Sequence, residues 1–209
     1  GERLGGEKLC AMAAKLGFGT AFTLADGFVS ASGNLPDPAK ISDGELANIS
    51  FGQGSLLATP LQIAHMTAVI AGGGASPMPT LYGGTTADGS VIVRDTPAES
   101  KRIISKSSAE ALCHLMVRVV ENGSGKKAAC GYGGTGGKTS SAQTGAYKNG
   151  SEIVHGWFTG FYPAENPRYA ITILEEGGGN GGALPAQIFA EICRGTALHD
   201  DPLLGRSAK

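Results

Sequence analysis

The sequence lacks an excess of charge of either sign, which limits the partners it can recognise. Its 17 Lys and Arg residues are balanced by 18 Asp and Glu residues, so the formal net charge is −1. No block of like charge occurs along the 209 residues. Because nucleic-acid-binding domains carry a basic patch or stripe, the sequence predicts no nucleic-acid partner.

Cysteines at metal-binding or redox spacing are also lacking. Four cysteines occur far apart and none forms a C-x-x-C pair. This spacing argues against a zinc site, and a disulfide framework would be unusual in a chain of this size. Cys10, Cys113 and Cys193 lie among apolar residues and are interpreted as small core side chains.

No apolar run reaches membrane-spanning length, and no signal peptide opens the chain. The first residue is Gly, followed at once by a helical pattern, so we expect the chain to begin within a longer gene product. Glycine is abundant, at 34 residues, but it falls in short clusters between periodic segments. Such clusters mark turns in a globular chain long enough for one core.

Apolar residues at helical spacing predict four helices. The first covers residues 4–16 and ends at Gly17, and the second begins at Pro60 after an N-cap at Thr59. The third follows a capping box at residues 107–110 and ends at 122–123. The fourth begins at Pro185 and is expected to place Ile188, Phe189, Ile192 and Cys193 on a sheet.

Strand-type patterns occupy residues 138–143, 155–162 and 169–175, with a shorter one at 91–93. A short turn at 163–167 predicts antiparallel pairing of the last two long strands. Residues 20–42 are expected to form a surface connection with a short extended piece, and 177–182 a glycine-rich crossing. Strands followed by a covering helix predict an α/β (α+β) layered fold, with an antiparallel sheet covered by helices.

One stretch carries most of the chemistry, Gly136-Gly137-Lys138-Thr139-Ser140-Ser141-Ala142-Gln143. A lysine meets three consecutive hydroxyl side chains, of which Thr139 and Ser141 share one face of a strand. An ammonium beside hydroxyls and edge N–H groups suits a carboxylate or a carbonyl oxygen. The alternative is a polar edge strand with a solvated lysine.

Three other motifs are interpreted as chance matches. G-K-T at 137–139 lacks the glycine that a phosphate-binding loop needs, since that position is Tyr132. Ser124-Gly125-Lys126-Lys127 fits S-x-x-K but falls in a turn, where the lysine cannot take the proton of the hydroxyl. Ser32-Gly33-Asn34 fits S-x-N but precedes a proline in a loop, and His65 lies among apolar residues typical of a core.

The order of motifs resembles the C-terminal part of a class B penicillin-binding transpeptidase. It runs G-Q-G at 52–54, T-P-L-Q at 59–62, N-G-S-G at 122–125, G-K-T-S-S-A-Q at 137–143 and H-G-W-F-T-G-F-Y-P at 155–163. The likeness covers nearly the whole chain, residues 1–209. It implies the penicillin-binding protein/serine β-lactamase-like transpeptidase fold, incomplete in this chain, with the family's S-x-x-K and S-x-N motifs expected upstream of residue 1.

The resemblance implies a serine acyl-enzyme that cross-links peptidoglycan stem peptides ending in D-Ala-D-Ala and is acylated by β-lactams. It implies that Lys138 acts catalytically and that Lys138, Thr139, Ser140 and Ser141 bind substrate, with Ser141 N–H as an oxyanion donor. The family has Gly where Ser140 stands, so a crowded groove is expected. No cofactor or metal is implied, and the chain alone is expected to be inactive.

Two other functions share this fold: a β-lactam sensor or β-lactamase relative, and a non-catalytic interaction domain. The G-Q-G and T-P-L-Q segments favour the transpeptidase. The resemblance places the parent protein at the extracytoplasmic face of the bacterial membrane, held by an N-terminal anchor outside these residues. Apolar surface left exposed by an incomplete domain is expected to cause self-association.

Overall fold

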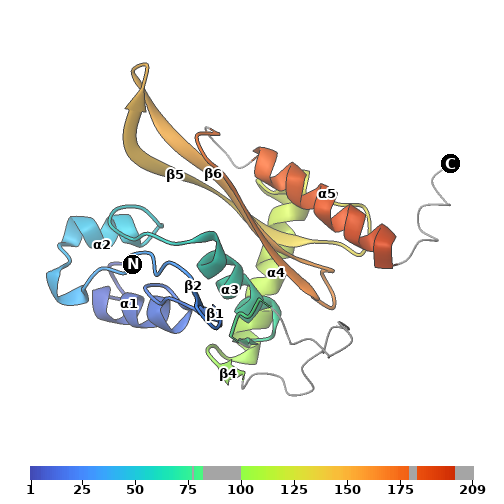
Figure 1. Ribbon diagram of the computed structural model, residues 1–209, viewed down its shortest axis with the longest axis horizontal. Helices are drawn as coiled ribbons and strands as arrows, with labels where there is room; N and C mark the ends of the chain where they lie inside the picture. Colours follow the sequence, from blue (N-terminus) through green and yellow to red (C-terminus); the bar gives the residue numbers. More distant parts are fainter. Residues whose placement is uncertain (77, 82–99, 179–182, 201–209) are drawn as a thin grey trace.

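The computed structural model describes residues 1–76, 78–81, 100–178 and 183–200. Helices flank a three-stranded antiparallel sheet, and a two-stranded hairpin extends from it (Figure 1). The helices are α1 (Gly6–Lys15), α2 (Asp43–Ile49), α3 (Pro60–Ala71), α4 (Lys106–Asn122) and α5 (Ala183–Asp200), with short 3-10 turns η1 (Pro38–Lys40) and η2 (Lys126–Ala128). The strands are β1 (Thr23–Ala25), β2 (Phe28–Val29), β3 (Ala75–Ser76), β4 (Lys101–Arg102), β5 (Gly136–Lys148), β6 (Ser151–Tyr162) and β7 (Tyr169–Glu175).

The main sheet has the order β5-β6-β7, and both pairs are antiparallel as the sequence predicts. β5 and β6 are longer than predicted, because their pairing continues to Lys148 and Ser151 at the tip of a hairpin. β1 pairs with β2 and β3 with β4 in two small two-stranded sheets. The strand predicted at 91–93 lies outside the described residues, as does most of the crossing at 177–182.

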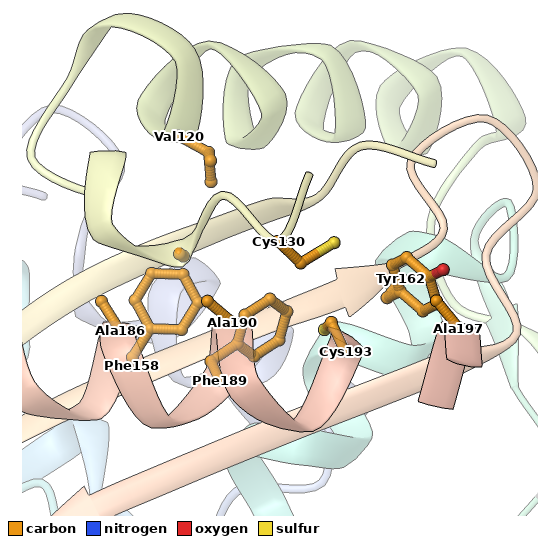
Figure 2. Packing of buried hydrophobic residues seen from close by; sticks show 10 residues of the cluster. Val120, Cys130, Phe158, Tyr162, Ala186, Phe189, Ala190, Cys193 and Ala197 are labelled. Atoms are coloured by element: carbon orange, nitrogen blue, oxygen red, sulfur yellow. The ribbon is translucent and has the colours of Figure 1, made fainter. Parts of the chain in front are cut away.

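The main apolar core lies between α5 and one face of the sheet (Figure 2). Phe158 of β6 and Phe189 of α5 are fully buried, with ring centroids 4.8 Å apart. Burying a side chain of this size contributes about 1.5–3 kcal/mol. Val120, near the end of α4, joins the same cluster and ties that helix to the core.

α5 does not bury the face that the sequence predicts. Phe189 and Cys193 face the sheet, but Ile188 and Ile192 are 39% and 42% exposed. The helix approaches the sheet over Gly160, whose added Cβ would lie 2.9 Å from the Phe189 ring. So close an approach favours small residues, and the remaining buried positions of α5 are Pro185, Ala186, Ala190 and Ala197.

α3 packs on the opposite face of the sheet, and hydrogen bonds between hydroxyl groups hold it in position there. Thr67 of α3 lies 2.6 Å from Thr159 of β6 through their Oγ1 atoms. Thr159 Oγ1 lies 2.7 Å from Thr172 Oγ1 on β7. Thr67 Oγ1 donates to Ile63 O within its own helix at 2.9 Å. The three threonines thus join helix and sheet through buried polar contacts rather than through apolar packing alone.

α3 also holds the N-terminal part of the chain through one amide. Gln62 is fully buried, and its Nε2 donates to the carbonyl oxygens of Gly17, Thr20 and Ser32 at 3.0, 3.1 and 2.7 Å. Its Oε1 accepts from Thr59 N at 2.9 Å, while Thr59 Oγ1 accepts from Gln62 N. Thr59 is therefore the N-cap, as predicted, and the capping box extends to Gln62.

Some helix boundaries differ from the prediction by one or two residues, as at α1, α4 and α5, and one helix was not predicted. α4 is capped by Ser105, whose Oγ accepts from Ser108 N, and not by Ser107. Starting the helix earlier also lets Lys106 reach Glu110 one turn on, at 3.7 Å. α2 was not predicted, although Ser42 and Glu45 have the S-x-x-E spacing of a helix start, and Ser42 Oγ accepts from Glu45 N.

Candidate active site

β5 carries the predicted site residues along one edge of the described sheet. Directly opposed residues of an antiparallel pair lie on the same face. Its register with β6 pairs Lys138 with Thr159, Thr139 with Phe158, Ser140 with Trp157 and Ser141 with Gly156. The stretch is a strand, which agrees with the prediction that its side chains alternate between two faces.

The four predicted residues are brought together on one strand but divided between its faces. Lys138 lies opposite Thr159, so it shares the α3 face with Ser140, and both side chains are exposed. Thr139 and Ser141 lie on the other face, toward α5. Thr139 is 6% exposed and Ser141 is half-buried. A ligand that contacts both sets must therefore lie along the edge of β5.

Gln53 shows which backbone groups of β5 point toward that edge. Its Nε2 donates to Ser141 O at 3.1 Å, across 88 residues of sequence. Since N–H and C=O of one residue in an antiparallel strand point to the same side, Ser141 N–H also points away from β6. Thr139, two residues earlier, has the same orientation. The edge thus presents the N–H group that the resemblance implies as an oxyanion donor.

Lys138 places its ammonium at the same edge. Its Nζ donates to Thr139 O at 2.5 Å, and its side chain is exposed. No ion pair joins it to a carboxylate within the described part of the chain. A positive charge beside outward N–H groups is an arrangement that attracts an anionic oxygen.

A carboxylate clamp holds the loop that carries Gln53. Glu45 Oε1 accepts from Ser55 N at 2.7 Å and from Ser55 Oγ at 2.5 Å. These hydrogen bonds from Ser55 lower the pKa of the Glu45 carboxyl. Sequence reasoning missed this clamp because it missed α2, which supplies Glu45. The signal available was the S-x-x-E pattern at Ser42.

Ser124 takes part in the site in a way that the sequence did not indicate. Its Oγ lies 2.6 Å from Thr139 Oγ1, so the turn after α4 is joined to β5. Lys127 lies in the short 3-10 turn η2, and no hydrogen bond joins it to Ser124 among the described contacts. The structure therefore brings Ser124 to the strand but does not pair it with a lysine base.

The S-x-N match at 32–34 and His65, which were also set aside from the sequence, make contacts elsewhere in the structure. Asn34 Nδ2 donates to Ser55 O at 2.6 Å, and Ser32 Oγ donates to Gly33 O at 3.2 Å, so neither side chain hydrogen-bonds to β5. His65 is 6% exposed and its ring packs on Phe22 with centroids 5.0 Å apart. This agrees with the interpretation of His65 as a core residue.

The described residues contain neither a candidate metal cluster nor a helix able to span a membrane. No cluster of three or more His, Cys, Asp or Glu side chains that could hold a metal ion occurs there. Within the same residues, no helix has the length and hydropathy needed to cross a membrane.

Comparison with known proteins gives consistent matches. The family model described as "Penicillin binding protein transpeptidase domain" matches residues 1–194. The peptidoglycan D,D-transpeptidase PbpA of Mycolicibacterium smegmatis is 32% identical over 203 residues, which cover 90% of this chain and 38% of that protein. The chain thus spans well under half the length of this relative.

Solved structures are similar to this chain over nearly its whole length. PBPA from Mycobacterium tuberculosis superposes with a TM-score of 0.76 at 29% identity, covering 92% of this chain and 44% of that one. Penicillin-binding protein 3 from Mycobacterium tuberculosis, solved with ampicillin, has a TM-score of 0.78 at 26% identity, covering 96% and 48%. With its lysine-bearing edge strand and this match over residues 1–194, the chain belongs to the penicillin-binding protein transpeptidase domain family.

Proposed function

We propose that the protein is part of a peptidoglycan D,D-transpeptidase and that β5 binds the carboxylate end of a stem peptide. The observation that carries this proposal is the hydrogen bond from Gln53 Nε2 to Ser141 O, which fixes the outward direction of the Ser141 backbone. The name of the relative PbpA, a peptidoglycan D,D-transpeptidase, supports the same reaction class.

In the proposed reaction, a serine hydroxyl adds to the carbonyl carbon of the penultimate D-alanine. Its proton passes to a lysine base, the C–N bond breaks, and the terminal D-alanine leaves with a proton on its amine. An amine of a second stem peptide then attacks the ester and releases the serine. Ser141 N–H would stabilise the oxyanion formed in both steps.

The residues of β5 would have different roles in binding and catalysis. Lys138 provides positive potential for the terminal carboxylate and assists the proton transfers. Thr139 and Ser141 donate hydrogen bonds to substrate, and Thr139 is oriented by Ser124 at 2.6 Å. An extended peptide would add along the edge of β5 by β-strand addition.

The serine nucleophile is proposed to come from a part of the domain outside these 209 residues. The one S-x-x-K match, at Ser124, has its hydroxyl against Thr139 and its lysine in a single 3-10 turn. β-Lactams would acylate the same external serine, in keeping with the ampicillin complex of penicillin-binding protein 3. The parent protein would act at the outer face of the bacterial cytoplasmic membrane, where peptidoglycan is assembled.

Labelling with a fluorescent penicillin tests the proposal. In the full-length protein, Lys138→Ala should slow acylation by about a hundredfold, the typical effect of removing one electrostatic donor. Lys148→Ala is the matched control, because Lys148 lies on the same strand at its far end, opposite Ser151. Wild-type labelling of Lys138→Ala would show that the site is wrongly assigned. A penicillin adduct formed by the 209-residue chain alone would show that the nucleophile is within it.

A further inference from the structure

A cavity of about 440 Å³ lies apart from β5. Among the described residues, it is lined by the end of α1, the segment that follows it, α3, Met78, β4 and Ile103, and by none from β5, β6 or β7. Its side chains include Lys15, Phe22, His65, Met78, Lys101 and Arg102. A concave site of this volume is within the range that holds small organic ligands.

Among the described residues, three cations and no carboxylate line the cavity. Lys15 and Lys101 are exposed, and neither makes an ion pair or a side-chain hydrogen bond within the described residues. Arg102 is held in place, because its Nη1 donates to Gly73 O at 2.7 Å. Like charges gathered at one concave surface produce a positive potential that an anion relieves.

The inner wall of the cavity is apolar. Phe22 is buried, at 1% exposed, whereas Met78 and the half-buried Ile103 contribute accessible apolar surface. His65 packs against Phe22, and its Nδ1 lies 3.2 Å from Leu16 O, which requires the proton on Nδ1. The other ring nitrogen, Nε2, has no hydrogen-bond partner in the described structure, but it is shielded from solvent and presents no polar group to the cavity.

We propose that this cavity binds a small organic anion, a carboxylate, sulfonate or phosphate with an aromatic or branched apolar body. The charged group would lie among Lys15, Lys101 and Arg102, and the apolar body would lie against Met78 and Ile103. This site is separate from the edge of β5 and does not depend on the proposed transpeptidase function.

The probe is 8-anilinonaphthalene-1-sulfonate, an aromatic sulfonate, titrated by fluorescence into the 209-residue chain and into the full-length protein. We expect one saturable site per chain, with an affinity that falls as salt rises. Lys15→Glu combined with Lys101→Glu should weaken binding at least about tenfold. Inorganic phosphate and the uncharged N-phenyl-1-naphthylamine should each bind at least about tenfold more weakly than the sulfonate.

The matched control is Lys8→Glu combined with Lys148→Glu, which makes the same change in net charge on exposed lysines outside the cavity. Its affinity should equal that of the wild type, and circular dichroism should show that both double variants are folded. Equal affinity in the two double variants would overturn the proposal. So would binding by the 209-residue chain that the full-length protein does not share, since that would place the cavity under another part of the protein.

Discussion

Gly137, next to the catalytic lysine candidate, gives the sharpest test of how the core supports the site. A Cβ added there would lie 2.2 Å from Phe158 Cζ, 2.6 Å from its Cε1 and 2.8 Å from Thr159 O. Gly137 does not have a left-handed backbone, so the conflict is purely steric. Phe158 cannot move aside easily, because it is fully buried and packs on Phe189.

Gly137→Ala should therefore lower the free energy of unfolding by about 1–3 kcal/mol, the usual penalty for inserting a methyl group into a packed core. Gly195→Ala is the matched control. Gly195 is in α5, and a Cβ there meets nothing within 4 Å. Alanine is preferred to glycine in a helix, so this variant should be more stable by about 0.5–1 kcal/mol.

The assay is urea unfolding at constant pH, followed by circular dichroism and by the fluorescence of Trp157, the single tryptophan. Adding Phe158→Leu to Gly137→Ala should make the two changes non-additive, because the smaller side chain leaves room for the new methyl group. If Gly137→Ala unfolds at the same urea concentration as the wild type, the close packing of Gly137 against Phe158 is wrong.

Four further predictions follow from other parts of the chain. Ser140→Gly in the full-length protein should raise the rate of β-lactam acylation, because an exposed side chain beside Lys138 would no longer crowd the groove; an unchanged rate in stopped-flow labelling would reject crowding. Burial raises the pKa of Cys193 from 9.0 to about 12, and the charge of nearby Cys130 makes a smaller contribution to the same shift. The neutral thiol therefore stabilises the fold below pH 9, and this stabilisation is lost as the pH rises toward 12. Cys193→Ala should therefore lose less stability than the wild type on alkaline titration, measured by urea unfolding at each pH. The lowered pKa of Glu45 means that its contribution is present above the ordinary value of 4.5 and is lost as pH falls through the folded-state value. Glu45→Gln should therefore flatten the acid side of the stability profile, measured by urea unfolding at each pH. Finally, Ile188→Lys with Ile192→Lys should reduce self-association of the 209-residue chain in sedimentation velocity; a wild-type chain that is strictly monomeric would contradict the expectation of exposed apolar surface.

The sequence predicted the parts of the fold in which local signals agree. α3 has an N-cap at Thr59, a proline at its first position and glycines at its end, and it forms where expected. β5 is flanked by glycines and rich in hydroxyl groups, and it forms an edge strand with alternating faces. In both cases the same residues that favour the element locally also fit its place in the fold.

The rest depended on contacts between distant residues. The buried face of α5 could not be read from apolar spacing, since Ile188 and Ile192 are as apolar as the residues that face inward. The close approach of α5 to Gly160 determines which face of the helix is buried, and Gly160 lies in β6, outside the helix itself. Likewise, Ser124 and Gln53 reach β5 across 15 and 88 residues, and no local pattern specifies those distances.

The threonine row between α3 and the sheet has a direction. Thr67 gives its hydroxyl proton to Ile63 O and accepts from Thr159 at 2.6 Å, a shorter contact than the 3.5 Å one from Thr159 Oγ1 to Ile171 O, and Thr159 accepts from Thr172. All three O–H dipoles are thus aligned head to tail, from β7 toward the helix. Valine has the shape of threonine but no hydroxyl group, so Thr159→Val would remove the contacts to both Thr67 and Thr172. The row therefore opposes sliding of α3 along the strands, because a shift would separate Thr67 from Thr159 and remove the one hydroxyl contact of the row that joins helix to sheet.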